Sequence, residues 1–263
     1  MTDRTIPAGR YMSSPVLAVS PSASLTDVDR RLKHHGISSL AVTDDDRLMG
    51  VISRTDLLRA GRRHAVESGS TALLDLPDQR VVEVMSKDAI TITTDTPLAA
   101  AAATMVEREF HRMFVTEGDR CVGVLSTRDV MRALGDHRIG GTIGEVMSKP
   151  VFTVEATATL AAATERLERA GISGVVVVEQ DWPVGVYTQV DALRARRFAA
   201  GVPVEDVMNS AFVCMPDVTT IHRAAAQALA LRVRRIIAVQ HRDMVGVLTG
   251  IDFARVAARA EVT

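Results

Sequence analysis

The sequence predicts a mixed α/β (α+β) fold in which one β-α-β-β-α unit is built four times along the chain. Two short marks that recur in register carry this prediction: a Val/Tyr-Met-Ser/Asn start and a Gly-Val/Ile-X-Ser/Thr-X-X-Asp end. Both marks step by 73, 62 and 61 residues, the kind of fixed offset that repeated supersecondary units leave. The starts contain Met12, Met85, Met147 and Met208, and the ends begin at Gly50, Gly123, Gly185 and Gly246.

Within each repeat the apolar pattern follows the same order. A short apolar run after the methionine predicts the first strand, at residues 16–19, 89–92, 151–154 and 212–215. An Ala- and Leu-rich helix follows, for example at residues 98–108 and 160–170. Continuous apolar runs such as residues 40–43 and 175–178 are typical of strands covered on both faces and predict the middle strand. The last strand ends at the glycine motif and leads straight into the final helix.

The repeat boundaries are predicted at residues 6–66, 79–136, 141–198 and 202–260. Repeats one and three carry Gly-Ile-Ser before the middle strand, whereas repeats two and four carry His111-Arg112 and Arg234-Arg235 there. This alternation predicts two pairs, 6–136 and 141–260, that arose by duplication of an ancestral pair. The extra residues between repeats one and two fall within 60–80, where Gly, Ser and Pro without sustained periodicity predict a linker or a lid.

Composition narrows the classes of function. The chain has 263 residues, 47% of them apolar, which is enough for about two packed domains. No apolar run approaches the roughly 20 residues of a membrane span, and no secretory signal is recognisable, so we expect a cytoplasmic protein that binds no membrane. A net charge of -1 argues against bulk nucleic-acid binding. Cys121 and Cys214, each alone in an apolar run, are expected to be small core residues.

A four-residue tetrad, with a hydroxyl first and an aspartate last, stands between the last strand and the final helix of every repeat. As a capping box it would stabilise the helix by about 1 kcal/mol. The same atoms suit a nucleoside phosphate, because the helix N-terminus and the hydroxyl attract a phosphate while the carboxylate accepts hydrogen bonds from a ribose. The hydroxyl residues are Ser53, Ser126, Thr188 and Thr249, and the aspartates are Asp56, Asp129, Asp191 and Asp252.

Two arginines are further candidates. Arg112 and Arg235 precede the motif glycines of repeats two and four by eleven residues, which places them at the edge of the middle strand. A guanidinium there is suited to pair with phosphate oxygens, and a surface arginine without a specific contact is the alternative. The motif glycines themselves are expected to serve a bulge or a close packing contact and to touch no ligand.

Taken together, the methionine-led strand, the helix, the two apolar strands and the Gly-X-X-Ser/Thr-X-X-Asp motif resemble the CBS domain, named after cystathionine β-synthase. The resemblance covers almost the whole chain. It implies that the domains pack through their sheets into two pseudo-twofold pairs, often called Bateman modules. It also implies that clefts in each pair bind adenosine-containing ligands such as AMP, ADP, ATP or S-adenosylmethionine, with NAD as a further candidate.

Carried over by position, the resemblance assigns ribose contacts to the four tetrad aspartates and phosphate contacts to the four tetrad hydroxyls. The residues that would flank the base are Val16, Ala89, Val151 and Phe212. Phe212 is larger than its counterparts, so it is expected to fill or narrow its own cleft. Repeats one and three lack the arginine of repeats two and four, so their clefts are expected to take a neutral ligand or to stay empty.

The residues favour a sensor over an enzyme. No His, Cys or carboxylate set has the convergent spacing of a nucleophile, a general base or a metal site, so we expect no catalysis and no required cofactor. A stand-alone regulatory protein must act on a separate protein partner through two arrangements of its modules, with residues 60–80 as the expected moving part. A homodimer and a single-chain disc both stay open. The alternative function is a structural or interaction scaffold with empty clefts.

Overall fold

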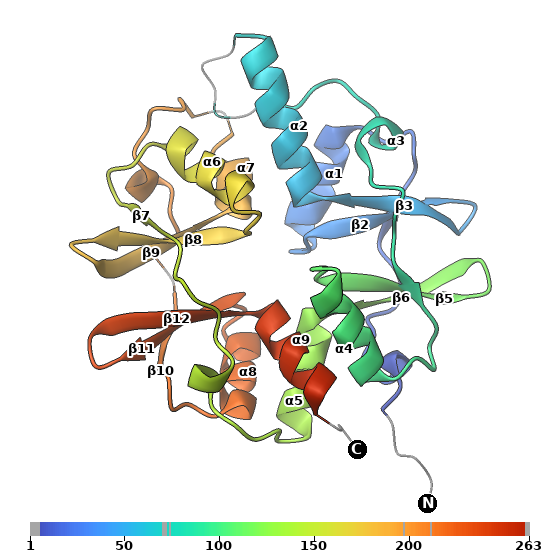
Figure 1. Ribbon diagram of the computed structural model, residues 1–263. Coiled ribbons are helices and arrows are strands. Elements are labelled where there is room, and N and C mark those ends of the chain that lie inside the picture. The colour runs from blue at the N-terminus through green and yellow to red at the C-terminus, as the bar shows by residue number, and fades with distance from the viewer. Residues whose placement is uncertain (1–5, 70–72, 74, 197, 211, 261–263) are drawn as a thin grey trace, which may run out of the picture. The chain divides into compact units, whose positions relative to one another are not determined.

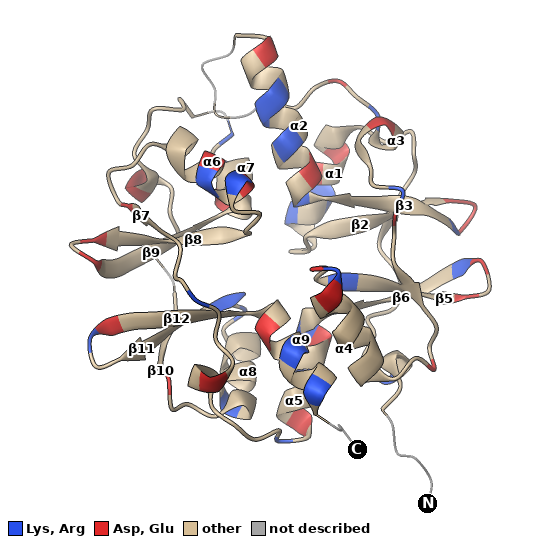
Figure 2. Ribbon diagram, in the orientation of Figure 1, with Lys and Arg blue, Asp and Glu red and all other residues tan. Residues whose placement is uncertain are grey.

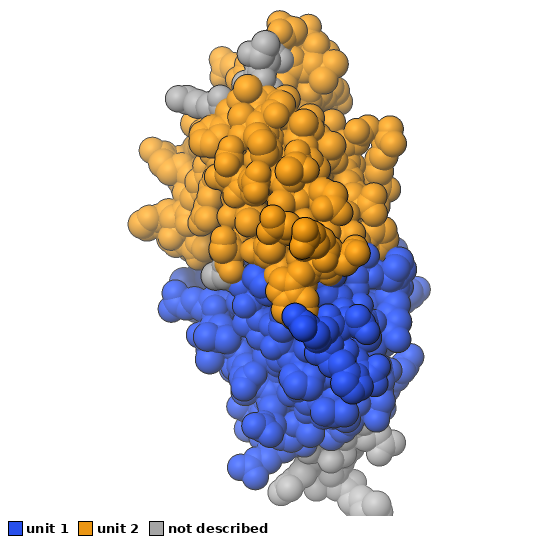
Figure 3. All heavy atoms as spheres, turned by 90° about the vertical axis from the view of Figure 1, so that its left-hand side faces the viewer, with its two compact units in different colours: residues 1–16, 89–151, 212–263 blue, residues 17–88, 152–211 orange. Residues whose placement is uncertain are grey.

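The computed structural model describes residues 6–69, 73, 75–196, 198–210 and 212–260 (Figure 1). The chain divides into two compact units (Figure 3). Unit 1 holds the described residues of 1–16, 89–151 and 212–263, and unit 2 holds those of 17–88 and 152–211. Repeats two and four therefore share unit 1, and repeats one and three share unit 2. The expected sheet pairing of repeats one and two, and of three and four, stays a prediction.

The order of elements matches the β-α-β-β-α prediction in every repeat (Figure 1). Repeat one consists of β1 (Ala18–Val19), α1 (Leu25–His34), β2 (Ser39–Asp44), β3 (Arg47–Ser53) and α2 (Arg54–Glu67). Repeat two has β4 (Thr91–Ile92), α4 (Leu98–Glu107), β5 (Arg112–Glu117), β6 (Arg120–Ser126) and α5 (Thr127–Asp136). Repeat three has β7 (Thr153–Glu155), α6 (Leu160–Arg169), β8 (Gly174–Glu179), β9 (Trp182–Thr188) and α7 (Gln189–Arg194). Repeat four has β10 (Cys214–Pro216), α8 (Ile221–Ala230), β11 (Arg235–Gln240), β12 (Asp243–Thr249) and α9 (Gly250–Arg259).

One-turn helices lead into the repeats. They are η1 (Ala8–Arg10), α3 (Val81–Val84), η2 (Ile143–Glu145) and η3 (Val204–Asp206). Each repeat then forms the same small ladder, in which the first strand pairs in parallel with the middle strand and the middle strand pairs antiparallel with the last. A register shift interrupts every antiparallel pair near the motif glycine. The first strands are shorter and start later than predicted, because parallel pairing begins only with carbonyls such as that of Leu17, which accepts from the Ala41 amide at 3.2 Å.

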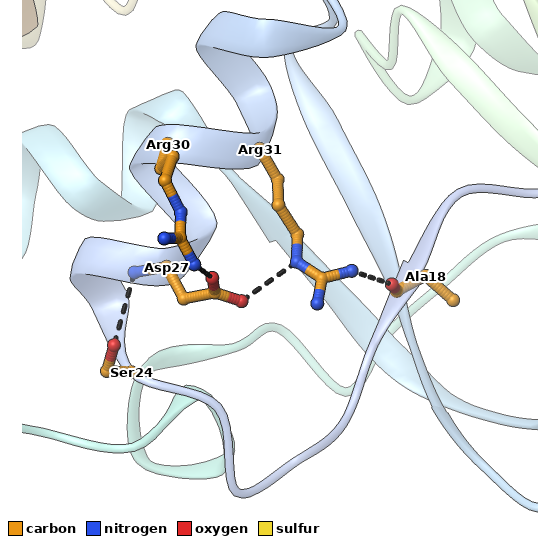
Figure 4. Close-up of polar contacts among 5 residues, drawn as sticks. All are labelled: Ala18, Ser24, Asp27, Arg30 and Arg31. Carbon is orange, nitrogen blue, oxygen red and sulfur yellow. Dashed lines mark hydrogen bonds and ion pairs between the residues drawn. The ribbon is translucent and has the colours of Figure 1, made fainter.

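Local side-chain bonds set where helices begin, as α1 illustrates (Figure 4). The hydroxyl of its N-cap Ser24 accepts a hydrogen bond from the Asp27 amide at 3.1 Å. The Asp27 carboxylate in turn pairs with Arg30 and, at 2.8 Å, with Arg31, whose guanidinium also reaches the Ala18 carbonyl. The hydrogen bond from Arg30 lowers the pKa of Asp27 from its ordinary value. An acidic group in the first turn also suits the positive end of the helix dipole.

Each unit has its own apolar core. In unit 1 helix α5 packs with the alanine-containing helices α4, α8 and α9, whose small side chains let the backbones approach closely. Gly250, the first residue of α9, lies against Thr127, the first residue of α5. In unit 2 a polar pair is enclosed in the core: the hydroxyls of Thr164 and Tyr187 are 2.7 Å apart and fully buried. Burial raises the pKa of Tyr187 to about 12.

The methionine start of one repeat packs on the glycine motif of another. Met12 lies against Gly123, and the backbone of the next residue, Ser13, exchanges two hydrogen bonds of 2.8 and 3.0 Å with Val124. The other three starts do the same, pairing Met85 with Gly50, Met147 with Gly246 and Met208 with Gly185. The glycines thus serve close packing, as predicted, but each methionine meets the glycine of the neighbouring repeat and not that of its own.

Two expectations about local structure are wrong. Residues 60–67 are not linker: α2 continues to Glu67, because its capping box at Ser53 starts a helix whose apolar face extends through Leu57 and Gly61 to the buried Ala65. Farther on, the buried Leu73 donates its amide to the Phe198 carbonyl at 2.8 Å.

Cys214 is the second wrong expectation. It is exposed on the short strand β10, whose neighbour Met215 takes the buried position. Cys121 is half-buried in β6. Alternation of side chains along a strand explains this outcome, because only every second residue of β10 faces the core.

The distribution of charged residues and the hydropathy of the helices complete the description of the fold. Basic and acidic residues both lie on the helices (Figure 2), in keeping with the net charge of -1. Over the part of the chain that the structure describes, every helix is too short or too polar to cross a bilayer.

Candidate functional site

The strand register places the two predicted arginines beside their tetrads. Arg112 is the Cα partner of Ser126 across the β5–β6 pair, and Arg235 is the partner of Thr249 across β11–β12. In unit 2 the matching partners of Ser53 and Thr188 are Ser39 and Gly174. The arginine therefore stands next to the tetrad hydroxyl in both repeats of unit 1, and a small residue takes its place in both repeats of unit 2.

Five basic side chains gather in unit 1 and are called the basic cluster below. They come from the starts of β5 and β11 and from the first turn of α5, and they are His111, Arg112, Arg128, Arg234 and Arg235. The His111 carbonyl accepts the Thr127 amide at 3.0 Å, which fixes the residue before β5 to the N-terminus of α5. Because Thr127 also meets Gly250, the N-termini of α5 and α9 come together at this cluster.

The electrostatics of the basic cluster favour an anion. Protein atoms crowd around His111 while its side chain stays accessible to solvent. This loss of hydration lowers the pKa of His111 from its ordinary value; the nearby guanidiniums lower it further, and Asp252 acts in the opposite direction. Loss of hydration among crowded protein atoms, with the charge of Arg128 second, also lowers the pKa of Arg234, which like His111 stays accessible to solvent. Since guanidiniums stay protonated in proteins, the cluster holds four positive charges at pH 7 beside a mostly neutral imidazole.

All four tetrads form the capping boxes that one interpretation predicted. In each, the backbone amide of the hydroxyl residue donates to the aspartate Oδ2 at 2.7 to 2.9 Å, and its hydroxyl donates to the same oxygen at 2.6 to 2.9 Å. A hydroxyl has a single proton to give. In this state the proton is used within the tetrad, so donation to a phosphate requires the hydroxyl to turn away from its aspartate.

The hydrogen-bond donors to the second oxygen of the tetrad aspartate, Oδ1, differ among the repeats. The Oδ1 atom of Asp56 has no hydrogen-bond partner within the described part of the chain. The same atom of Asp129 accepts from the half-exposed Arg132 at 3.1 Å. In Asp252, which is fully buried, Oδ1 accepts from Ser148 at 2.6 Å and from Arg255 at 2.8 Å. A ribose hydroxyl therefore meets an open acceptor at Asp56, one exposed competitor at Asp129 and two competitors at Asp252.

Asp191 completes the set of tetrad aspartates. It is buried, and its Oδ2 accepts from Thr188 as the other boxes do. It lies in unit 2 with Asp56, whereas Asp129 and Asp252 lie in unit 1.

The predicted base-flanking residues lie just before the first strands and not inside them. They are half-buried, and each sits at or beside the point where the chain passes from one unit to the other: Val16, Ala89, Val151 and Phe212. The carbonyl of the residue after each of them joins the parallel ladder, as that of Ile90 does by accepting from Phe114 at 3.0 Å. Their contact with a base stays a prediction.

Sequence reasoning missed three members of the basic cluster. His111 and Arg234 stood in the sequence as the first residues of the His-Arg and Arg-Arg doublets, and Arg128 stood inside a tetrad. The doublets were a usable signal, because a residue just before a hairpin strand lies beside the helix that follows the hairpin. The sequence pattern did not predict that repeats two and four pack in the same unit. Within the described ranges, no group of three His, Cys, Asp or Glu side chains is placed to hold a metal ion.

Comparison with solved structures confirms the architecture. Protein MJ1225 from Methanocaldococcus jannaschii, described as a candidate archaeal homologue of g-AMPK, superposes with a TM-score of 0.84 at 16% identity, covering 95% of this chain and 99% of that one. A conserved protein from Pyrococcus horikoshii gives a TM-score of 0.67 at 17% identity over 96% of this chain and all of the other. At these identities the likeness concerns the fold alone.

Sequence comparison identifies the family. A 33.4 kDa protein in a ribosomal RNA operon of Thermofilum pendens is 23% identical over 196 residues, which are 69% of this chain and 62% of that relative. The family model of the CBS domain matches residues 8–63, 81–136 and 143–197. These segments are the first three repeats and more than half of the chain, and the fourth repeat has the same order of elements. The chain therefore belongs to the CBS-domain family.

Proposed function

We propose that this protein is a non-catalytic regulator that binds an adenine nucleotide through unit 1 and passes the binding state to a separate protein. The observation that carries the proposal is the basic cluster, where guanidiniums from two repeats meet beside two tetrads. Membership of a family whose clefts take adenosine-containing ligands supports an adenosine moiety. AMP, ADP and ATP fit this charge best, and NAD and S-adenosylmethionine are the other ligands to test.

The phosphate is the part of the ligand that the cluster would hold. Arginine presents several N–H donors in a planar fork that matches phosphate oxygens, and these bonds are about twice as strong as neutral ones. Arg112 and Arg235 each lie across a strand pair from a tetrad hydroxyl residue. The tetrad hydroxyls and the first helical amide of α5 are engaged within the protein. A guanidinium keeps its charge and has five N–H donors, so the arginines are the groups that we propose to bind the phosphate.

The ribose would be bound by a tetrad aspartate. Both unit 1 aspartates are buried, and Asp129 is the better candidate because only the exposed Arg132 competes for its Oδ1 atom, whereas two donors occupy that atom of Asp252. Unit 2 has the open carboxylate of Asp56 but no arginine at the positions of Ser39 and Gly174. We therefore propose that unit 2 takes an adenosine compound without a phosphate requirement, or none.

The experiment is a titration calorimetry panel of AMP, ADP, ATP, NAD and S-adenosylmethionine against the wild type and Arg112→Gln. Loss of one charged hydrogen bond of about 1.5–3 kcal/mol lowers phosphate-ligand affinity about 10- to 100-fold. Arg223→Gln is the matched control, because Arg223 is an exposed helix residue of the same unit outside the cluster. Binding with equal affinity by both variants and the wild type would contradict the phosphate assignment.

The scaffold function is the second candidate, and one observation favours it. Every tetrad forms a capping box from its own side chains, so the repeated pattern of hydroxyl and aspartate has a structural use without any ligand. If no member of the panel binds the wild type at millimolar concentration, the scaffold becomes the better description and the search turns to protein partners.

A further inference from the structure

His111 is a titratable group in a place where the other three repeats have none. The residue before the middle strand is Ser38 in repeat one, Ser173 in repeat three and Arg234 in repeat four. None of those side chains changes charge between pH 5 and 8, whereas an imidazole does. The carbonyl of His111 accepts a hydrogen bond from the first amide of α5, so the backbone from which the ring projects is held in place within the basic cluster.

Charged groups from β5, from the start of β11 and from α9 act on this imidazole. Arg112 follows it on β5, and Arg234 and Arg235 come from the start of β11 in the other repeat of unit 1. Asp252 of α9 is the one opposing charge among the groups that act on it, and its carboxylate already accepts four hydrogen bonds. Crowding by protein atoms and the three arginines both disfavour the protonated ring, so the pKa of His111 lies below its ordinary value.

A phosphate reverses this balance. A dianionic phosphate among the guanidiniums screens their repulsion of an imidazolium and supplies an opposite charge within a few ångströms. The protonated ring also offers a second N–H donor that the neutral ring lacks. The protein without a ligand thus favours neutral His111, and the protein with a bound phosphate favours the charged form.

We propose, resting on the proposed function, that binding of a phosphate-bearing ligand to unit 1 transfers a proton from solution to His111, so that unit 1 binds this ligand more tightly as the pH falls. The sign follows from linkage: a ligand that raises the proton affinity of a group is itself bound more strongly when that group is protonated. The limit for one proton is a tenfold change in affinity per pH unit.

The ligand's own titration has the opposite sign. A terminal phosphate has a second pKa of about 6, so at pH 7 about 0.1 proton remains on it and is released when cations surround it. Proton uptake at His111 approaches one per ligand, because the free imidazole is mostly neutral at this pH. Net proton uptake on binding therefore indicates titration of His111, and net proton release indicates titration of the ligand's phosphate.

The test is titration calorimetry of ADP into the full-length protein at pH 7, in two phosphate-free buffers with different ionisation enthalpies. We expect net uptake of about half a proton or more per ADP in the wild type. His111→Gln is expected to release about 0.1 proton, and the ratio of its Kd to that of the wild type is expected to rise several-fold between pH 8 and pH 6. Taking the ratio cancels the ligand's own titration.

His241→Asn is the matched control. His241 lies in the turn of the β11–β12 hairpin, at the opposite end from Arg235, with a positive φ that asparagine tolerates. This variant should keep the wild-type proton uptake. ADP binding without net uptake, or uptake that persists in His111→Gln, would overturn the inference while leaving the proposed function intact. If ADP does not bind the wild type, AMP or ATP takes its place in the same titration, and absence of binding by all three would contradict the proposed function itself.

Discussion

The contact between Met12 and Gly123 offers a direct test of how the repeats are connected. A methyl group added at Gly123 would lie 2.5 Å from the Met12 sulfur and 3.1 Å from its Cγ atom, so something must shift. Overpacking of this kind costs about 1–3 kcal/mol, and the flexible methionine keeps the cost of Gly123→Ala near the lower end. For a chain of this size we expect the midpoint of thermal unfolding to fall by about 2–4 °C per kcal/mol.

Truncating the methionine should remove the clash. In Met12→Ala/Gly123→Ala the new methyl group enters space that the sulfur has left, so the double variant should be about as stable as Met12→Ala alone. The expected coupling is about 1 kcal/mol or more, measured by urea or thermal denaturation of the four proteins of the cycle. Coincident transitions by fluorescence and circular dichroism are the condition for reading these values as free energies.

A second cycle provides the control. Met12→Ala and Gly50→Ala should be additive within about 0.5 kcal/mol, because a methyl group at Gly50 meets Met85 and the Ser86 carbonyl instead. That carbonyl is backbone and cannot turn aside, so Gly50→Ala should cost more than Gly123→Ala. A coupling free energy between Met12 and Gly50, with none between Met12 and Gly123, would refute the conclusion that each methionine packs on the glycine of the neighbouring repeat.

Three further predictions follow from single contacts. Gly250→Ala should destabilise unit 1 by about 1–3 kcal/mol in thermal unfolding, because its methyl group would overlap a buried threonine of α5. Tyr187→Phe should cost about 1–3 kcal/mol by leaving the buried Thr164 hydroxyl without its partner, and an unchanged urea midpoint would contradict this. The hydrogen bond from Arg30 lowers the pKa of Asp27, so its contribution is present above the unfolded value of about 3.9 and is lost as the pH falls through the lower folded value. Asp27→Asn should therefore destabilise at pH 7 and have little effect at pH 2.

Much of the fold could be predicted because its signals are local. The strand and helix order follows from apolar runs that each span fewer than twelve residues, and the capping boxes follow from a hydroxyl and a carboxylate three residues apart. Prediction failed where tertiary packing extended or shortened an element. Helix α2 continues to Glu67 because Ala65 is buried in unit 2. Cys214 is exposed because only one face of the three-residue strand β10, the face that carries Met215, is buried.

Part of the candidate site could be predicted from the sequence. Arg112 and Arg235 could be placed, because eleven residues before the motif glycine is a fixed distance along one hairpin. Their companions His111, Arg128 and Arg234 could not, because they form a cluster only when repeats two and four share a unit.

The number of repeats, their internal order and the tetrads could all be predicted from the sequence, because each of these rests on contacts within a few residues or within one hairpin. Which methionine packs on which glycine, and which repeats share a core, became known from the three-dimensional packing. The four repeats carry nearly the same marks, so every methionine is chemically suited to every glycine. The choice among these equivalent partners depends on tertiary packing between repeats, because the paired residues are distant in the chain, from 23 residues for Met208 and Gly185 to 111 for Met12 and Gly123.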